Sequence, residues 1–194
     1  MIQKRLLLVF FFLFQLMFGQ EREAVLVFKD STEVKGLGQI KNDKIHFRVS
    51  EDDKTEIWDD QIVIGLTFTG YGFSERYEYV QSDKYSKPVI MELLDQGLVY
   101  LYREMDGQLG VQPTGHIGTS GVGVGAAVGF NLKNLYFIRK KGETKAMELS
   151  FSFKTRALRY FSDCEIVVEK INSREFTKNN IPELVNYYNN YCGE

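Results

Sequence analysis

Two cysteines carry the best-defined chemistry in this chain of 194 residues. Cys164 and Cys192 are its only thiols, and no histidine lies near either of them in the sequence. A structural zinc site takes about four ligands, and a catalytic cysteine needs a neighbouring base. Neither requirement is met locally. We therefore predict a Cys164–Cys192 disulfide, with two buried free thiols as the alternative.

A second set of reactive side chains lies in a glycine-rich segment. His116 precedes Thr119 and Ser120, and a histidine near a hydroxyl can act as base to a nucleophile. Eight glycines occur in the 23 residues from Gly107 to Gly129. Because glycine loses the most backbone entropy on ordering, we expect a flexible loop there. Such a loop holds catalytic geometry poorly, so we interpret His116 as a solvated loop residue.

The same glycines could be taken for a phosphate cradle. Their spacing at positions 121, 123, 125 and 129 is G-x-G-x-G-x-x-x-G, which differs from the dinucleotide fingerprint G-x-G-x-x-G. No P-loop lysine follows the glycines. We therefore predict no nucleotide ligand and no cofactor.

Paired carboxylates suggest acid–base or calcium chemistry. Asp59 and Asp60 are adjacent, and residues 51–53 are all acidic. Glycosidase carboxylates must face each other across a substrate, and the spacing of an EF-hand loop is absent. We interpret these residues as turn and surface residues. His46 alternates with apolar neighbours, which predicts the polar face of a strand. The sequence thus predicts no metal site and no catalytic residue.

The N-terminus has the order of features of an export signal. Lys4 and Arg5 precede an apolar run from residue 6 to residue 18, interrupted once, and a small residue follows. That run of about 13 residues is short for a bilayer-spanning helix, which needs about 20. We predict a signal peptide at 1–19, a mature start near Gln20, and a periplasmic or secreted protein. A retained anchor helix is the alternative.

Composition narrows the partners of the mature chain. Without Lys4 and Arg5 it carries 22 basic and 26 acidic residues, a net charge of −4. Nucleic-acid binding needs a basic footprint, so we predict no nucleic-acid partner. No integral membrane span is expected after signal cleavage, because the predicted strands of about 5–8 residues are shorter than a bilayer requires.

The sequence pattern predicts a β-rich body that positions the candidate residues described above. Apolar residues alternate with polar ones at 45–49, as in a half-buried strand. Five short strands separated by turn signals between residues 25 and 68 suit a small curled sheet. We predict a β-rich body at 20–105, a glycine-rich flexible insertion at 106–130, and a β-hairpin at 131–155 that completes the body and whose last strand covers 147–153.

The C-terminal segment 160–194 predicts a helical hairpin. Ser162 with Glu165, and Asn180 with Glu183, have the spacing of helix-starting capping boxes. Apolar residues follow each start at helical spacing. In an antiparallel pair the start of the first helix lies beside the end of the second, which brings the two cysteines together. The fold class is therefore α+β, mainly β: an antiparallel meander or small curled barrel followed by a C-terminal antiparallel helical hairpin.

Several short stretches of the chain are similar to segments of other proteins: residues 28–36, 97–102, 136–140, 160–164 and 185–189, with Cys192. In these stretches the chain resembles a diffuse set of uncharacterised exported β-rich proteins of Bacteroidetes-type bacteria. The resemblance implies a β-rich body with a cysteine-linked helical tail and transfers no site. We expect a non-enzymatic binding module whose partner is a protein or envelope component. An envelope hydrolase and an outer-membrane-associated structural protein are the alternatives.

Overall fold

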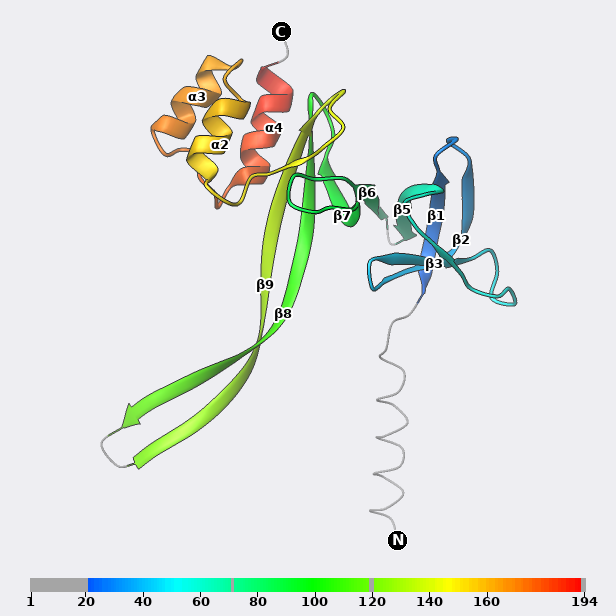
Figure 1. Ribbon diagram of the computed structural model, residues 1–194, viewed down its shortest axis with the longest axis horizontal. Helices are drawn as coiled ribbons and strands as arrows, with labels where there is room; N and C mark the ends of the chain where they lie inside the picture. The colour runs from blue at the N-terminus through cyan, green and yellow to red at the C-terminus, as the bar shows by residue number, and fades with distance from the viewer. Residues whose placement is uncertain (1–20, 71, 119–120, 193–194) are drawn as a thin grey trace. The chain divides into compact units, whose positions relative to one another are not determined.

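The computed structural model describes residues 21–70, 72–118 and 121–192, and describes side chains in these ranges except at 105–133. Within these ranges, ten strands and three helices follow one another along the chain (Figure 1). The strands are antiparallel and the helices come last, which confirms the predicted α+β, mainly β class. The chain divides into two compact units, Met1–Tyr79 and Val80–Glu194.

The N-terminal unit is built from six antiparallel strands in the order β6-β5-β1-β2-β3-β4. Their bounds are β1 (Arg22–Phe28), β2 (Glu33–Lys41), β3 (Lys44–Arg48), β4 (Glu56–Trp58), β5 (Val63–Gly70) and β6 (Phe73–Val80). The Tyr79 hydroxyl on β6 donates a hydrogen bond of 2.9 Å to the carbonyl oxygen of Trp58 on β4. Because these strands stand at opposite ends of the order, the sheet must curl to bring them together.

Glycine at two strand positions permits this curl. A Cβ atom on Gly65 would lie 1.9 Å from the carbonyl oxygen of Tyr77, and one on Gly36 would lie 2.3 Å from that of Arg48. Only a residue without a side chain allows the backbones to approach so closely. The buried side chains of the unit then line the inside of the curl: Ala24, Leu26, Ile45, Phe47, Val63, Leu66 and Phe68.

The C-terminal unit combines four strands with three helices. Its strands, in the order β10-β9-β8-β7, are β7 (Val89–Asp95), β8 (Val99–Gly118), β9 (Gly121–Lys140) and β10 (Met147–Glu148). The helices α2 (Phe153–Tyr160), α3 (Glu165–Asn172) and α4 (Ile181–Tyr191) gather beside one end of the β8–β9 hairpin (Figure 1). Their apolar faces share one core cluster with Val99, Leu101 and Ile138 of the strands.

The last predicted strand, at 147–153, is wrong in its second half. β10 ends at Glu148, Ser152 takes a left-handed φ of 50°, and Phe153 begins α2. Phe153 and Ala157 repeat at helical spacing and are buried, so the alternation from 147 to 153 spans a short strand, a turn and the first residue of a helix. The C-terminal region therefore has three helices, and the predicted hairpin is formed by the last two, α3 and α4.

The glycine-rich segment differs from its prediction in backbone structure. β8 and β9 stay in antiparallel register from Val99 opposite Lys140 to Gly118 opposite Gly121. Inter-strand pairing supplies partners for backbone groups whatever the side chain, so glycine density did not exclude strand here. The flexibility expected for 106–130 stays a prediction.

Helix starts also depart from the predicted capping boxes. Cys164, rather than Ser162, is the N-cap of α3, and the Ser162 hydroxyl donates to the Arg159 carbonyl at 3.0 Å. Asn180 is the N-cap of α4, as predicted, but its side chain accepts a hydrogen bond from the Thr177 backbone N–H, at 2.7 Å, in the preceding loop. Both capping signals therefore lie close to the helix starts, but Ser162 bonds the last turn of α2 and Asn180 bonds the preceding loop.

Candidate binding groove in the N-terminal unit

The predicted cysteine pair lies where the sequence placed it. Cys164 precedes α3 and Cys192 follows α4, with their Cα atoms 5.6 Å apart and their Sγ atoms at disulfide distance, 2.06 Å. Cys164 belongs to the core cluster, and Cys192 packs against it. The bridge therefore closes the helical tail, which makes it a structural feature and not a reactive site.

Other residues considered for chemistry are separate from one another or lie outside the description. His116 lies on β8, but its side chain is outside the description, and Thr119 and Ser120 lie outside the described residues. The glycines at 121–129 lie on β9. His46 is half-buried on β3. The structure does not gather these residues into a site that it describes.

The acidic residues act in turns. Asp53 accepts hydrogen bonds from the backbone N–H and the hydroxyl of Ser50, at 2.9 and 2.7 Å. Asp59 accepts one from the backbone N–H of Gln61, at 3.1 Å. Among the described side chains, which leave out those at 105–133, no group of three or more from His, Cys, Asp and Glu is placed to hold a metal ion. Across residues 21–70, 72–118 and 121–192, no helix has the length and apolar character to cross a membrane.

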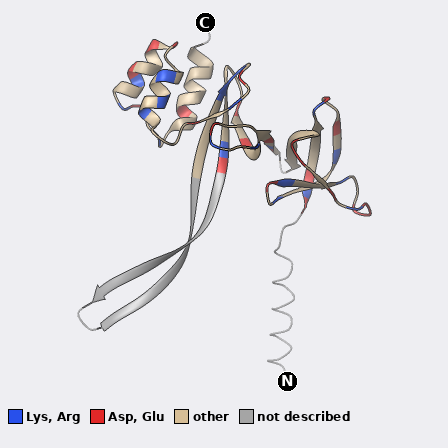
Figure 2. Cartoon of the chain, viewed as in Figure 1, with Lys and Arg blue, Asp and Glu red and all other residues tan. Residues whose placement is uncertain are grey.

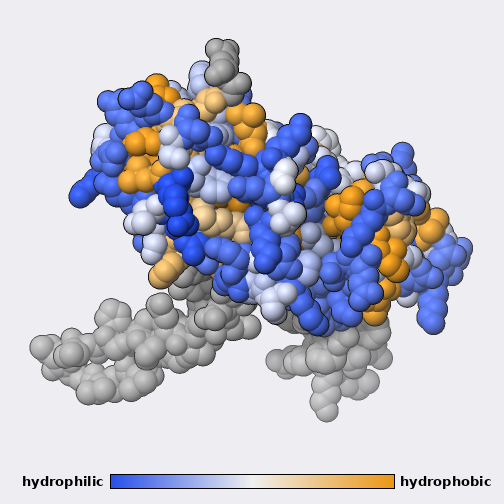
Figure 3. Space-filling view, turned by 45° about the horizontal axis from the view of Figure 1, so that its top comes forward, coloured by the Kyte–Doolittle hydropathy of each residue, from blue (hydrophilic) through white to orange (hydrophobic). Residues whose placement is uncertain are grey.

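A groove of about 430 Å³ opens in the N-terminal unit. Its floor is formed by buried Leu26 and Phe47, and its walls include Phe28 and Trp58. Hydrophobic residues reach the surface of this unit, where Figure 3 shows them in orange among hydrophilic neighbours. Pockets of about 300–1,000 Å³ with apolar linings are the usual form of ligand sites. The groove is therefore the candidate site of this unit.

Trp58 is the most distinctive residue of the groove and the only tryptophan of the chain. Its ring meets Phe28 edge-on, with centroids 5.2 Å apart and planes at 83°. The indole Nε1 is buried, and among the described residues it has no hydrogen-bond partner. A buried N–H without an acceptor costs free energy, so the packing of the Trp58 ring against Phe28 must offset this cost.

Tyr79 fixes the position of this wall. Its hydroxyl holds the Trp58 carbonyl, as described above, and also lies 3.3 Å from the carbonyl oxygen of Asp43. Burial raises the pKa of Tyr79 to about 12, and the carboxylates of Asp59 and Asp60 act in the same direction. The hydroxyl therefore stays protonated and remains a donor at physiological pH.

Charged side chains surround the groove. Arg48 forms an ion pair with Glu21 at 2.6 Å, and a guanidinium N–H also donates to the carbonyl oxygen of Glu51. Asp53, Lys54 and Glu56 complete the charged lining. Basic and acidic residues are interspersed over this unit (Figure 2). The apolar floor is thus framed by groups that can select a ligand by charge.

A second hollow, of about 660 Å³, adjoins the first. Both are lined by Val49, whose side chain is 61% exposed, and the second is also lined by Glu23, Lys35 and Glu51. Strand pairing puts Glu23 and Lys35 on the face of the sheet opposite Leu26 and Val34. The two hollows therefore belong to different faces and share only Val49, and we call the two hollows together the double groove.

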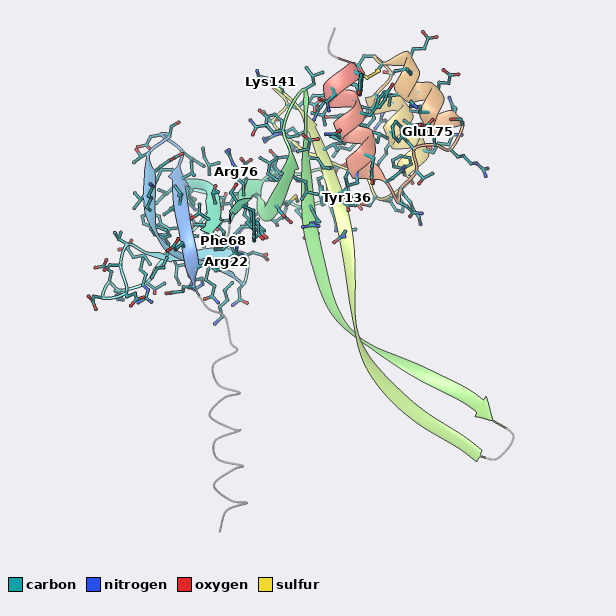
Figure 4. The ribbon with its side chains drawn as sticks, turned by 180° about the vertical axis from the view of Figure 1, so that it is seen from behind. Arg22, Phe68, Arg76, Tyr136, Lys141 and Glu175 are labelled. Carbon is teal, nitrogen blue, oxygen red and sulfur yellow. A yellow bond between two sulfur atoms is a disulfide. The ribbon has the colours of Figure 1, made fainter. Side chains whose placement is uncertain are left out.

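An aromatic and charged cluster closes another part of the unit. The Arg22 guanidinium lies 4.5 Å from the centre of the Phe68 ring and pairs with Glu75 at 2.8 Å. Figure 4 shows Arg22 and Phe68 side by side. Since these charges already hold one another, the cluster stabilises the curled sheet and offers less to a ligand than the double groove does.

Sequence reasoning did not find the double groove. Its walls come from Phe28 on β1 and Trp58 on β4, which are 30 positions apart. No local motif joins them, because strand pairing and the curl bring them together. A single tryptophan at the end of a short predicted strand was the one signal available.

Comparisons with protein-family models, with curated proteins and with solved structures find no match for this chain. The chemistry of the double groove is therefore the basis for a functional conclusion.

Proposed function

We propose that the protein is an exported, non-enzymatic binding module of the cell envelope, and that the double groove of its N-terminal unit binds a partner protein. The observation that carries the proposal is the apolar groove walled by Phe28 and Trp58. Half-buried aromatic side chains framed by charge, like Phe28 and Trp58 here, are typical of recognition sites, where apolar anchors supply affinity and a polar rim supplies specificity.

The composition of the double groove favours binding over hydrolysis. Its lining holds no histidine or cysteine, and its one serine, Ser50, hydrogen-bonds to Asp53 within a turn. The Asp53 carboxylate that holds the Ser50 hydroxyl also accepts a hydrogen bond from the Ser50 backbone N–H, at 2.9 Å, so this pair closes an exposed turn, and no histidine accompanies it as the base of a nucleophilic serine.

The compartment is supported by the cysteine pair. Disulfides persist in oxidising compartments and are rare in the cytosol, and Cys164 and Cys192 lie at disulfide distance. This agrees with the proposed export and with a residence in the periplasm or outside the cell. The signal peptide proposed at 1–19 lies outside the described residues.

A charge placed at the centre of the double groove tests the function. Val49→Asp introduces a carboxylate on a side chain that is 61% exposed, so the fold is expected to remain. Ile62→Asp is the matched control, because Ile62 is 53% exposed and lines neither hollow. Envelope proteins cross-linked to each variant are identified, and the purified partner is titrated while Trp58 fluorescence is followed.

We expect Val49→Asp to weaken binding by about tenfold or more, since a buried unpaired charge at an interface is costly. Ile62→Asp should bind as the unmodified protein does. Equal binding by all three proteins, with Trp58 fluorescence unchanged on titration, would show that the partner does not use this surface.

A further inference from the structure

The β8–β9 hairpin is longer than the strands that flank it. β8 and β9 have 20 residues each, and their pairing runs without a register shift from Val99 opposite Lys140 to Gly118 opposite Gly121. β7 and β10, of seven and two residues, pair with the base of the hairpin, at residues 101–103 and 137–138. We call the part beyond this base, residues 107–118 of β8 and 121–132 of β9, the hairpin arm.

The hairpin arm lacks charge. The chain is 26% Asp, Glu, Lys and Arg, yet none of these occurs from position 107 to position 132. Asp106 and Lys133 bound this stretch, and the register places them opposite each other. Surfaces that face water normally carry charges of both signs, so the composition of the arm is not that of a strand pair made for water on either face.

The strand register divides the arm into two unlike faces. Directly paired residues share a face, and successive residues lie on opposite faces. One face runs from Gly107 opposite Leu132 to Ile117 opposite Val122, and its other positions hold glycine, valine, leucine, proline, alanine and phenylalanine. The opposite face holds glutamine, asparagine, threonine, histidine, glycine and one alanine. The arm is therefore amphipathic along its whole length.

The apolar face continues a face that the helices cover at the base of the hairpin. Leu101 is paired with Ile138, and both share the core cluster with α2, α3 and α4. Leu101 and Val111 lie an even number of positions apart on β8, so they belong to the same face. The arm thus extends a face that is buried at its base.

The dimensions of the arm match a lipid bilayer. The twelve positions from 107 to 118 rise about 40 Å along the strand, which at a tilt of about 45° spans about 28 Å. The hydrocarbon core is about 30 Å thick, and a strand that crosses it has about 9–11 residues. The expectation of no membrane span rested on strands of about 5–8 residues, and β8 and β9 are longer.

We infer that the hairpin arm inserts into a lipid bilayer with its apolar face toward the acyl chains, and that the arms of several copies lie there edge to edge. Alternation of apolar and polar residues along each strand is the composition of strands that cross a bilayer. This inference concerns the C-terminal unit, and it goes beyond the protein binding proposed for the N-terminal unit.

The assembly of copies follows from the backbone. In hydrocarbon every backbone N–H and C=O group needs a partner. Each strand of the arm pairs with the other along one edge, and β7 and β10 reach only the base of the outer edges in the described chain. Identical arms side by side supply the missing partners, and they keep their polar faces together on the side away from lipid.

Flotation of the mature protein with vesicles of phosphatidylethanolamine and phosphatidylglycerol, followed by a wash at high salt, tests insertion. Val111→Lys places a charge on the apolar face near the middle of the arm, and the adjacent Gln112→Lys places it on the polar face. We expect Val111→Lys to lower vesicle binding by about tenfold or more, because lysine on a lipid-facing position is costly at the midplane. Gln112→Lys should change binding by less than about threefold.

A dye sensitive to its surroundings, attached to single introduced cysteines, reads out the faces directly. The native cysteines are paired with each other and leave the new thiol as the reactive one. On vesicles, dyes on Val124→Cys and Val128→Cys should be quenched by spin-labelled lipid, and dyes on Thr114→Cys and Ala127→Cys by iodide in the water. Cross-linking on the vesicles should give oligomers that are absent without lipid.

Protein that fails to float, or dyes that respond alike on both faces, would overturn the inference. A dimer in water that Val111→Lys dissociates, with no flotation, would show that a second copy covers the apolar face instead. Val49→Asp lies in the other unit and should float as the unmodified protein does, so a failure of insertion and a failure of the proposed protein binding are told apart.

Discussion

The two units solve the same burial problem in different ways. The N-terminal unit covers the apolar face of its sheet with the sheet itself, by curling until Tyr79 of β6 reaches Trp58 of β4. The C-terminal unit covers its strands with α2, α3 and α4, whose buried residues form one cluster with Val99, Leu101 and Ile138. A sheet must bury one face against something, and curvature and added helices are two of the few ways available.

The difference shows in how each core is covered. The three helices help to bury Phe161, Val167, Ile181 and Leu184 completely. The curled sheet of six short strands leaves an apolar groove lined by Leu26, Phe28 and Trp58. The comparison teaches that a sheet which covers itself can leave apolar side chains at an opening, whereas added helices bury them.

A methyl group at a close backbone approach should have the largest effect. In Gly65→Ala the new Cβ would lie 1.9 Å from the Tyr77 carbonyl oxygen. We expect a loss of more than about 3 kcal/mol, because backbone must shift to remove the clash. Denaturation followed by the fluorescence of Trp58, the only tryptophan, reports on the N-terminal unit alone.

The half-buried residue Thr67 on the same strand supplies the control, and Thr67→Ala should cost less than about 1 kcal/mol. Near-UV circular dichroism of the tyrosines of the C-terminal unit should keep its own transition in Gly65→Ala. Simultaneous loss of both signals would mean that the units do not unfold separately, and the comparison would break.

Removal of the cross-link should act on the other unit. Cys192→Ser opens a loop with a sequence separation of 28 residues. The chain-entropy treatment gives about 3–4 kcal/mol for a loop of this size. The tyrosine transition should move to lower denaturant while the Trp58 transition stays in place.

Peptide mapping without reductant, on protein taken from the envelope, checks the same bridge chemically. Alkylatable thiols at both Cys164 and Cys192 would show that the pair is not oxidised in its native compartment, and would remove the support that it gives to export.

A smaller loss is expected where α4 meets the strands. The Asn189 side chain accepts a hydrogen bond from the Val99 N–H at 2.8 Å and donates one to the Val99 carbonyl oxygen at 2.9 Å. Val99 is completely buried. Asn189→Ala leaves both backbone groups without partners and should cost about 2 kcal/mol.

Asn190→Ala is the matched variant, because Asn190 is exposed and its side chain donates within α4, to the Asn186 carbonyl oxygen at 2.7 Å. It should change the free energy of unfolding, measured by urea denaturation with the tyrosine signal, by less than about 0.5 kcal/mol. Equal effects of the two substitutions would show that the hydrogen bonds between Asn189 and the Val99 backbone do not hold α4 against the strands.

The smallest expected effect is a dependence on pH. Burial alone would raise the pKa of Asp163, but hydrogen bonds from Lys140, at 2.7 Å, and from Tyr188, at 2.8 Å, outweigh it and lower that pKa. A carboxyl group with a lowered pKa in the folded state stabilises the protein above its unfolded value of about 3.9. That contribution is lost as the pH falls through the folded pKa.

Because the Asp163 side chain is 54% exposed, the contribution should stay below about 1 kcal/mol. Asp163→Asn should therefore flatten the acid side of the stability curve of the C-terminal unit, measured by urea denaturation between about pH 5 and pH 2. An unchanged slope of stability against pH in this variant would mean that the Lys140–Asp163 ion pair does not contribute to the stability of the C-terminal unit.

Local patterns along the sequence were enough for the elements with strong periodicity. The alternation at Ile45 and Phe47 predicted β3, and the stripe through Val167 and Ile171 predicted α3, because each element buries one face and its period is written in the order of residues. The start of α2 was not predicted from the sequence. Apolar residues alternate there, at Met147, Leu149, Phe151 and Phe153, over a stretch where a short strand is followed by a helix.

The proximity of the cysteines was also accessible to sequence reasoning. Two helices joined by a short loop must run back along one another, and this brings the N-cap Cys164 to the C-cap Cys192. The sequence by itself thus determined the class of fold, the helical tail and the partners in its cross-link, because each depends on residues near one another or on the period of a single element.

Only the tertiary structure decided where a ligand can bind. Phe28 and Trp58 meet because β1 and β4 lie on a sheet that curls, and the curl depends on close backbone approaches at Gly36 and Gly65. The groove is what the curl leaves uncovered, so its shape, its apolar floor and the charges on its rim arise from pairing between distant strands. No periodic pattern or motif in the sequence predicts the contact between Phe28 and Trp58, since that contact depends on how the strands are arranged around one another.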